Sequence, residues 1–473
     1  MAGTRALRAA ALVVALLAVT VAPRPAAALT ASELALYKQL AGGLASLSTS
    51  VVSNKAPPAT PATNVTAGPT VAAAAAAKAT PVAAAATPAG ASTAAVSKAL
   101  GTIMAAAALD AQAAGTLGNP RVFRYLDGSK RTALFRLPNG NRPIKGTCIF
   151  VHGCKHDPES WFYKSANCPK CTGLPEEVSH TKQCLARGYA VLALRSLDRE
   201  YRSRCFSSSG TTLSEQAGGD DHPSSRQVVQ AFTAQYGLAN KPKYIFGISA
   251  GASFAIKFPG TMWVDGVISE VNMPWAKAWG AVDSKGRFKY PFPPTVFYEM
   301  ANDATTSQQI RQALTIFRNN NVRADVVKVP MRAVTPDFLS QRSIYLSKQQ
   351  SRQIQAALRK IGLLDANGWI KYDPRKNTEW TQKLAKALSW LRRDSPYYNL
   401  ISDESQVWQE LNMAYSQHEI VSDYVRPTLM WLEQRGNANL NALVQQYSLN
   451  GTISCLNEST EGCARRRARA LLR

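Results

Sequence analysis

From about residue 121 onward, short runs of large apolar side chains alternate with stretches in which apolar side chains recur every three or four positions. The runs are typical of buried strands, and the stretches are typical of amphipathic helices. Strands are predicted at 121–125, 132–137, 147–151, 189–194, 243–246, 264–271, 295–300 and 324–329. Helices are predicted at 175–187, 225–236, 307–319 and 419–434. Apolar strands alternating with helices predict a mostly parallel sheet with helices on both faces.

The first two predicted strands are joined across Asp127-Gly128, a dipeptide typical of a tight hairpin turn. They therefore form an antiparallel pair at the start of the sheet. The chain from 121 to 434 is long enough for one domain of this class.

The preceding part of the chain has a different composition. From about Pro57 to Ala114 it consists mostly of Ala, Thr, Pro, Ser and Val. So few large apolar side chains cannot bury a core. We therefore interpret residues 29–120 as a low-complexity stalk.

Residues 1–28 have the pattern of a secretory signal peptide. Arg5 and Arg8 precede an apolar run, and 26–28 offer a small-residue cleavage site. The run is short for a membrane span, so no transmembrane anchor is expected, although an uncleaved anchor or a transit peptide stays open. Eight cysteines and three N-x-S/T sequons agree with a secreted, extracellular protein.

Six of the cysteines lie between Cys148 and Cys205, and six cysteines allow 15 pairings. Cys455 and Cys463 stand apart and are expected to pair with each other. The pair Cys168 and Cys171 forms a C-x-x-C motif. Because no second pair of metal ligands accompanies this motif, we favour a stapled loop over a zinc or redox site.

The chain carries a formal charge of +24, and residues 435–473 form a basic C-terminal tail. A strongly basic surface favours contact with acidic partners, such as cell-wall or other surface polymers. A generally solvated basic surface explains the charge as well. No nucleic-acid-binding motif accompanies it, so no specific nucleic acid partner is expected.

The sequence Gly247-Ile248-Ser249-Ala250-Gly251 lies between a predicted strand and a small-residue segment. Strand, G-x-S-x-G and helix make up a nucleophile elbow, in which the serine occupies a strained turn. Gly247 and Gly251 allow the strand and the helix to pass closely. Ser249 is therefore the candidate nucleophile.

Two antiparallel strands, a wound α/β run and an elbow in the fifth strand resemble the α/β-hydrolase fold over about residues 121–434. His-Gly-Cys at 152–154 with the Ser-Ala-Gly elbow is also similar to secreted polyester depolymerases and feruloyl esterases. The Cys-Pro-x-Cys loop after His-Gly resembles uncharacterised plant and algal secreted hydrolases.

The resemblance implies a triad in the chain order serine, acid, histidine. His418 is the one histidine after Ser249, so it is the expected base. Asp303, in the loop after the strand at 295–300, is the expected acid, although an Asp there can also simply cap the following helix. Glu270 and Asp337 are the alternative acids.

The resemblance also implies an oxyanion hole formed by the N–H groups of Cys154 and Ala250. His152 is expected to have a structural role. The aromatic segment 159–163 either lines the pocket or packs in the core.

Residues 331–412 form a helical insert between the last core strand and His418. Helical inserts at this position of the fold often cap the pocket. The insert is either such a lid or a second structural subdomain.

We therefore expect a secreted serine hydrolase, specifically a carboxylic-ester hydrolase that acts on small-molecule or polymer esters through an acyl-enzyme. No metal-ligand cluster, phosphate loop or dinucleotide fingerprint is present in the sequence, so no cofactor is expected. Two alternatives stay open. One is a non-catalytic binding or wall-associated protein of this fold, and the other is a serine peptidase or amidase.

Overall fold

The computed structural model describes residues 120–124, 132–139, 143–199, 203–207, 221–275, 279–392, 398–403 and 405–449. The predicted signal peptide, the stalk up to residue 119, the three sequons and the pair Cys455 and Cys463 lie outside the described residues. So does the arginine-rich end of the tail.

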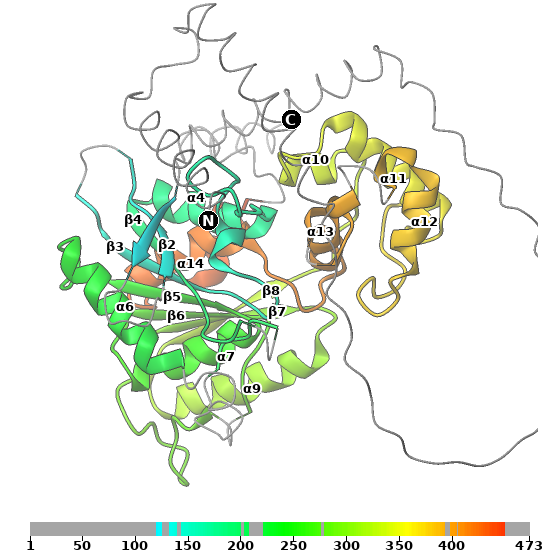
Figure 1. Ribbon diagram of the computed structural model, residues 1–473. Helices are drawn as coiled ribbons and strands as arrows, with labels where there is room; N and C mark the ends of the chain where they lie inside the picture. The colour runs from blue at the N-terminus through cyan, green and yellow to red at the C-terminus, as the bar shows by residue number, and fades with distance from the viewer. Residues whose placement is uncertain are drawn as a thin grey trace, which may run out of the picture. The chain divides into compact units, whose positions relative to one another are not determined.

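One eight-stranded sheet forms the centre of the described chain (Figure 1). Its strands are β1 (Arg121–Arg124), β2 (Thr132–Arg136), β3 (Gly146–Val151), β4 (Tyr189–Leu194), β5 (Lys243–Ile248), β6 (Gly266–Glu270), β7 (Thr295–Met300) and β8 (Ala324–Val329). Their order in space is β1-β2-β4-β3-β5-β6-β7-β8. Strand β2 is antiparallel to both of its neighbours, and β3 to β8 run parallel. This order is that of the α/β-hydrolase fold, and it confirms the predicted fold class.

Helices cover both faces of the sheet (Figure 1). Helices α4 (Pro175–Ala186) and α14 (Val425–Glu433) lie on one face, and α6 (Asp221–Gln235), α7 (Ala250–Lys257) and α9 (Ala304–Asn319) lie on the other. Strand β3 shows the alternation. Cys148 and Phe150 pack with the α4 face, whereas Ile149 and Val151 pack with the α6 face. Burial on both sides explains why the strands appear as continuous apolar runs.

The helix predicted at 419–434 begins later, at Val425, after the 3-10 turn η6 (Ser422–Tyr424). Tertiary hydrogen bonds hold the preceding backbone out of the helix. The N–H of Val421 donates to Glu270 Oε2 at 3.2 Å, and the N–H of Ser422 donates to Glu176 Oε2 at 2.6 Å. The prediction of a helix start at Glu419 is therefore wrong, because buried carboxylates compete for these donors.

Among the described residues between β8 and His418, the α-helices are α10 (Phe338–Arg342), α11 (Lys348–Lys360), α12 (Glu379–Ala387) and α13 (Gln406–Tyr415). Helix α11 begins with a capping box, in which Ser347 and Gln350 each accept from the other's backbone N–H. A tight hairpin turn surrounds Gly368, with Leu364 bridged to Ile370. Gly368 has a φ of +87°, and an added Cβ would lie 2.7 Å from the Val334 carbonyl oxygen, so no other residue fits this turn.

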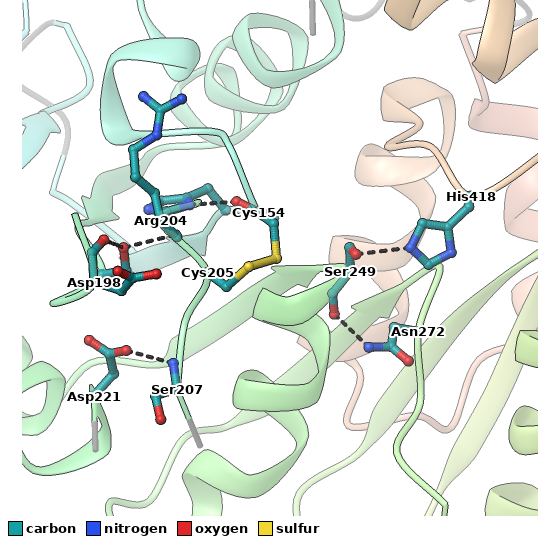
Figure 2. The surroundings of a disulfide bond; sticks show 12 residues. Cys154, Asp198, Arg204, Cys205, Ser207, Asp221, Ser249, Asn272 and His418 are labelled. Atoms are coloured by element: carbon teal, nitrogen blue, oxygen red, sulfur yellow. Dashed lines mark hydrogen bonds between the residues drawn. A yellow bond between two sulfur atoms is a disulfide. The ribbon is translucent and has the colours of Figure 1, made fainter. Parts of the chain in front are cut away.

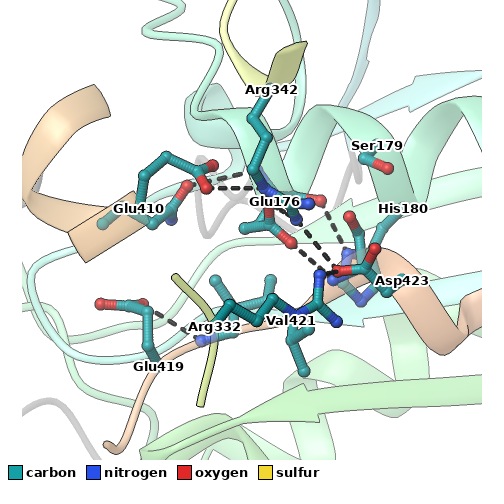
Figure 3. A network of polar contacts seen from close by, with 12 residues as sticks. Glu176, Ser179, His180, Arg332, Arg342, Glu410, Glu419, Val421 and Asp423 are labelled. Carbon is teal, nitrogen blue, oxygen red and sulfur yellow. Dashed lines mark hydrogen bonds and ion pairs between the residues drawn. The ribbon is translucent and has the colours of Figure 1, made fainter. Parts of the chain in front are cut away.

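A buried charge cluster ties the insert to the sheet domain (Figure 3). Arg342 of α10 pairs with Glu176 of α4, with Glu410 of α13 at 2.6 Å and with Asp423 of η6 at 3.2 Å. Asp423 also pairs with Arg332 at 2.8 Å. Because Arg342 and its three carboxylate partners are excluded from water, loss of one of them would leave a buried charge uncompensated. The insert also shares one continuous apolar core with α4 and α14.

Helix α15 (Leu440–Tyr447) lies beyond the boundary predicted at residue 434. Leu440 is buried in the same core as α14, and the N–H of Leu449 donates to the Asp423 carbonyl at 3.0 Å. The folded region therefore extends at least to Leu449, so residues 435–449 are not part of a free tail. Four further 3-10 turns are η2 (Pro158–Trp161), η3 (Phe258–Gly260), η4 (Ser389–Leu391) and η5 (Tyr398–Leu400). Among the described residues, no helix has the length and apolarity that a membrane span requires.

Candidate active site

Ser249 lies in the turn between β5 and α7, with φ 53° and ψ −114°. This is a strained conformation for a residue other than glycine. The two elbow glycines make the turn possible. A Cβ on Gly247 would lie 2.2 Å from the Gly251 carbonyl oxygen, and a Cβ on Gly251 would lie 2.3 Å from the Val151 carbonyl oxygen. Neither position has room for a side chain, so the strand and the helix approach closely as expected of an elbow.

His418 lies on the loop that follows α13, and its Nε2 is 2.9 Å from Ser249 Oγ (Figure 2). The loop is fixed to the ends of β7 and β8 through Ser416. The Ser416 hydroxyl accepts from the N–H of Ala301 at 2.8 Å and donates to the Val329 carbonyl at 2.7 Å. The left-handed backbone of Ser416 and His418 (φ 58° and 43°) turns the imidazole toward the elbow.

Asp303 supplies the carboxylate on the other side of the imidazole. Its Oδ2 is 2.9 Å from His418 Nδ1. The same carboxylate caps α9, because Oδ1 accepts from the N–H of Thr306 and Oδ2 from its hydroxyl. Capping and contact with histidine therefore coexist. Burial raises the pKa of Asp303, but the hydrogen bonds from His418 and Thr306 outweigh burial and lower it, so the group is ionised at neutral pH.

The two alternative acids lie in other contacts. Glu270 is fully buried and its Oε1 lies 2.8 Å from His180 Nε2. Asp337 pairs with Arg352 at 2.8 Å near the start of α10. The structure thus brings Ser249, His418 and Asp303 together and places Glu270 and Asp337 elsewhere.

The two predicted oxyanion donors flank the serine. Ala250 is the first residue of α7, where backbone N–H groups have no acceptor within the helix. Cys154 follows β3, and a disulfide to Cys205 fixes this loop (Figure 2). Gly153 lies directly against Ser249, since an added Cβ would be 3.5 Å from Ser249 Cβ. In the neighbouring loop Cys168 is bonded to Cys171, in line with the stapled-loop interpretation.

A pocket of about 190 Å³ opens at the serine. Its lining is polar and combines residues from the oxyanion loop, α4, the insert and the histidine loop. The lining residues are His152, Gly153, Cys154, Lys155, His156, Trp161, Glu177, Ile248, Ser249, Arg375, His418, Glu419 and Ile420. Trp161 is both fully buried and part of this lining, so the two interpretations of segment 159–163 both apply to it.

Two residues of the site have no signal in the sequence. Arg375 of the insert lines the pocket and pairs with Glu419 at 2.6 Å. Asn272 donates from its side-chain amide to the Ser249 carbonyl at 2.9 Å (Figure 2). Each is brought to the site by long-range folding. In the part of the chain that the structure describes, no group of three or more His, Cys, Asp or Glu side chains could hold a metal ion.

No family profile matches the chain, and no curated protein matches it. Among solved structures, an α/β serine hydrolase without a lid from Xanthomonas campestris is 15% identical, covering 46% of this chain and 85% of its own, with a TM-score of 0.31. Esterase 2 of Thermogutta terrifontis is 17% identical over 52% of this chain and 94% of its own (TM-score 0.31). The acylaminoacyl peptidase of Pyrococcus horikoshii is 12% identical over 55% of this chain and 43% of its own (TM-score 0.33). By its own strand order and its elbow, the chain has the α/β-hydrolase fold.

Proposed function

We propose that the protein is a serine hydrolase that cleaves carboxylic esters through an acyl-enzyme. The observation that carries the proposal is the continuous chain of contacts from Ser249 Oγ to His418 Nε2 and from His418 Nδ1 to Asp303 Oδ2. A serine hydroxyl is a weak nucleophile, and this arrangement supplies the base and the group that orients the base.

In the acylation step, Ser249 Oγ attacks the ester carbonyl carbon while His418 Nε2 takes the hydroxyl proton. The carbonyl oxygen becomes an oxyanion, which accepts from the N–H groups of Cys154 and Ala250. The oxyanion then collapses, the bond to the alcohol breaks, and His418 returns the proton to the departing alcohol. Water attacks the acyl-enzyme in the same way and releases the acid. Asp303 stays ionised throughout and holds the imidazole in the tautomer that faces the serine.

We further propose that the insert acts as a rim element of the pocket. Two contacts support this role. Arg375 forms part of the pocket wall, and Asp403 pairs with Lys155 directly after the oxyanion loop. A helical body at this position restricts water at the reacting carbonyl.

The proposal has three further parts. The protein is secreted through the predicted signal peptide, residues 29–120 form a stalk, and the basic surface binds acidic surface polymers. N-terminal sequencing of the mature protein tests the first of these. A mature chain that still begins at Met1 would contradict cleavage.

Labelling by a fluorophosphonate probe is the direct test of the nucleophile. We expect the wild-type protein to be labelled and Ser249→Ala to be unlabelled, with turnover of p-nitrophenyl acetate reduced by about 10⁶-fold. Ser253→Ala, on the same helix, is the matched control and should retain both. An unlabelled wild-type protein, or a Ser249→Ala variant within about tenfold of wild type, would contradict the assignment. Hydrolysis of p-nitroanilides with no hydrolysis of esters would favour an amidase.

A further inference from the structure

Two buried polar atoms in the pocket lining have no hydrogen-bond partner among the described residues: His152 Nε2 and the indole Nε1 of Trp161. His152 is 1% exposed and Trp161 is fully buried. Buried polar groups in native proteins are nearly always paired, and those that are not call for an explanation. Both residues line the pocket that also contains the candidate nucleophile Ser249, which points to a ligand that pairs with them.

The protonation state of His152 follows from its neighbour. His152 Nδ1 lies 2.8 Å from the Gly153 carbonyl oxygen, which can only accept, so Nδ1 carries the hydrogen. In a neutral imidazole Nε2 is then a bare acceptor. Burial lowers the pKa of His152 to about 3, against the opposing effect of the bond to Gly153, so the ring is neutral at ordinary pH.

Trp161 offers the opposite function. Its ring stacks on Phe150 with centroids 4.2 Å apart, which fixes the orientation of the indole. An indole N–H can only donate. The residues that line the pocket therefore include one unused acceptor and one unused donor.

The rest of the lining excludes a long hydrocarbon. His156 pairs with Glu177 at 2.9 Å and Arg375 pairs with Glu419 at 2.6 Å, so two polar side-chain pairs form part of the lining. The volume of about 190 Å³ is below the roughly 300–1,000 Å³ of common small-molecule pockets. A fatty acyl chain would displace water from these polar groups without forming hydrogen bonds to them, which is unfavourable.

We propose that the substrate group that occupies this pocket is short and hydroxylated, with hydroxyls that accept from Trp161 Nε1–H and donate to His152 Nε2. A hydroxyl fits because it is both donor and acceptor. The substrate class is thus esters of short hydroxy acids or of small polyols and sugars, and this rests on the proposed ester hydrolysis.

Isosteric pairs of esters test the proposal on the wild-type protein. p-Nitrophenyl glycolate is compared with p-nitrophenyl propionate on the acyl side, and 2-hydroxyethyl acetate with propyl acetate on the alcohol side. We expect kcat/KM to favour the hydroxylated member at least tenfold in one pair, because a site with unpaired polar groups rejects the methyl analogue. Equal or better turnover of the alkyl member in both pairs would overturn the proposal.

Trp161→Phe removes the donor and keeps an aromatic ring, so it should bring the preferred ratio of kcat/KM toward one, mainly through KM. Trp408→Phe is the matched control. Trp408 also has a buried indole N–H without a partner among the described residues, but it does not line the pocket. We expect Trp408→Phe to keep the wild-type ratio. Thermal melting of both variants separates loss of recognition from loss of fold.

Failure of the two proposals can be told apart. Ser249→Ala cannot turn over esters, so ligand-observed NMR on this variant measures recognition alone. Stronger saturation transfer to a hydroxylated ester than to its alkyl partner supports the pocket assignment, even in a protein that a fluorophosphonate does not label. Labelling with equal or weaker transfer to the hydroxylated ester retains the hydrolase and removes the substrate class.

Discussion

Two histidine–carboxylate pairs in this molecule have nearly the same geometry and different surroundings. His418 and Asp303 are 2.9 Å apart at the pocket, and His180 and Glu270 are 2.8 Å apart in the interior. The second nitrogen of His180 lies 2.8 Å from the Glu176 carbonyl, and the side chain is fully buried. The second nitrogen of His418 faces Ser249 Oγ, and its side chain is 34% exposed.

The difference shows that a histidine–carboxylate contact does not by itself indicate chemistry. What matters is the group on the other ring nitrogen and access to a ligand. Both ring nitrogens of His180 bond to other groups of the protein, and the side chain links α4 to the end of β6. His418 has one nitrogen in contact with Ser249 Oγ, where the proposed mechanism needs a proton acceptor. The comparison predicts that the two pairs respond to the same substitution in opposite ways.

The substitutions Asp303→Asn and Glu270→Gln test most directly whether the two pairs differ in role. Asn can still cap α9, so Asp303→Asn should keep the fold, but it favours the wrong tautomer of His418. We expect kcat to fall by about 10⁴-fold with the urea midpoint little changed. Glu270→Gln should instead lower the free energy of unfolding by about 3 kcal/mol, because a buried ion pair loses its charge.

Steady-state kinetics on p-nitrophenyl acetate and urea unfolding of both variants check this prediction. If Glu270→Gln abolishes turnover in a protein that melts like wild type, the alternative acid at Glu270 regains support. If Asp303→Asn retains activity within tenfold of wild type, Asp303 is a helix cap alone.

Much of the fold was predictable because it follows from local patterns. Strand β4 was predicted at its observed bounds, since burial on both faces makes it continuously apolar. Asp303 could be predicted because an Asp after a strand is typical both of a helix cap and of the acid in this fold. Arg375 and Asn272 were not, because their roles depend on partners far along the chain. Helix α15 was missed because the prediction for 435–473 followed the arginines near the C-terminus and not the apolar residues between 440 and 447.

The interior pair should also impose a pH dependence on stability that the site pair does not share. Burial lowers the pKa of His180, but the Glu270 carboxylate outweighs it, so the pKa of His180 is raised. Burial also raises the pKa of Glu270, despite His180. The folded state then holds the proton shared by this pair more tightly than the unfolded state. The contribution of His180 is full below about pH 6.5 and that of Glu270 below about pH 4.3, and each is lost as pH rises through the group's folded pKa.

The pKa of Asp303 is lowered, so its stabilisation is present above about pH 4 and is lost as pH falls. Urea unfolding from pH 5 to 9 measures the interior pair, with the double variant His180→Leu/Glu270→Leu as reference. We expect the difference in unfolding free energy between wild type and double variant to decrease toward pH 9. An increase toward pH 9 would contradict the assignment of a shared proton to the pair.

A third pair, His156 and Glu177, sharpens the comparison with the smallest expected effect. It lines the pocket, as His418 does, but the serine hydroxyl bonds to His418 instead. Glu177 is also held by Gln409, whose amide donates to Oε2 at 2.7 Å.

Asn at position 156 can replace the bond to Glu177. We therefore expect His156→Asn to lower kcat/KM by less than about tenfold, the value of one ordinary hydrogen bond, whereas His418→Asn should match Ser249→Ala. Fluorophosphonate labelling rates give the same contrast without a substrate. If His156→Asn were as inactive as His418→Asn in a folded protein, location at the pocket would matter more than the group on the second nitrogen, and the distinction drawn between the pairs would fail.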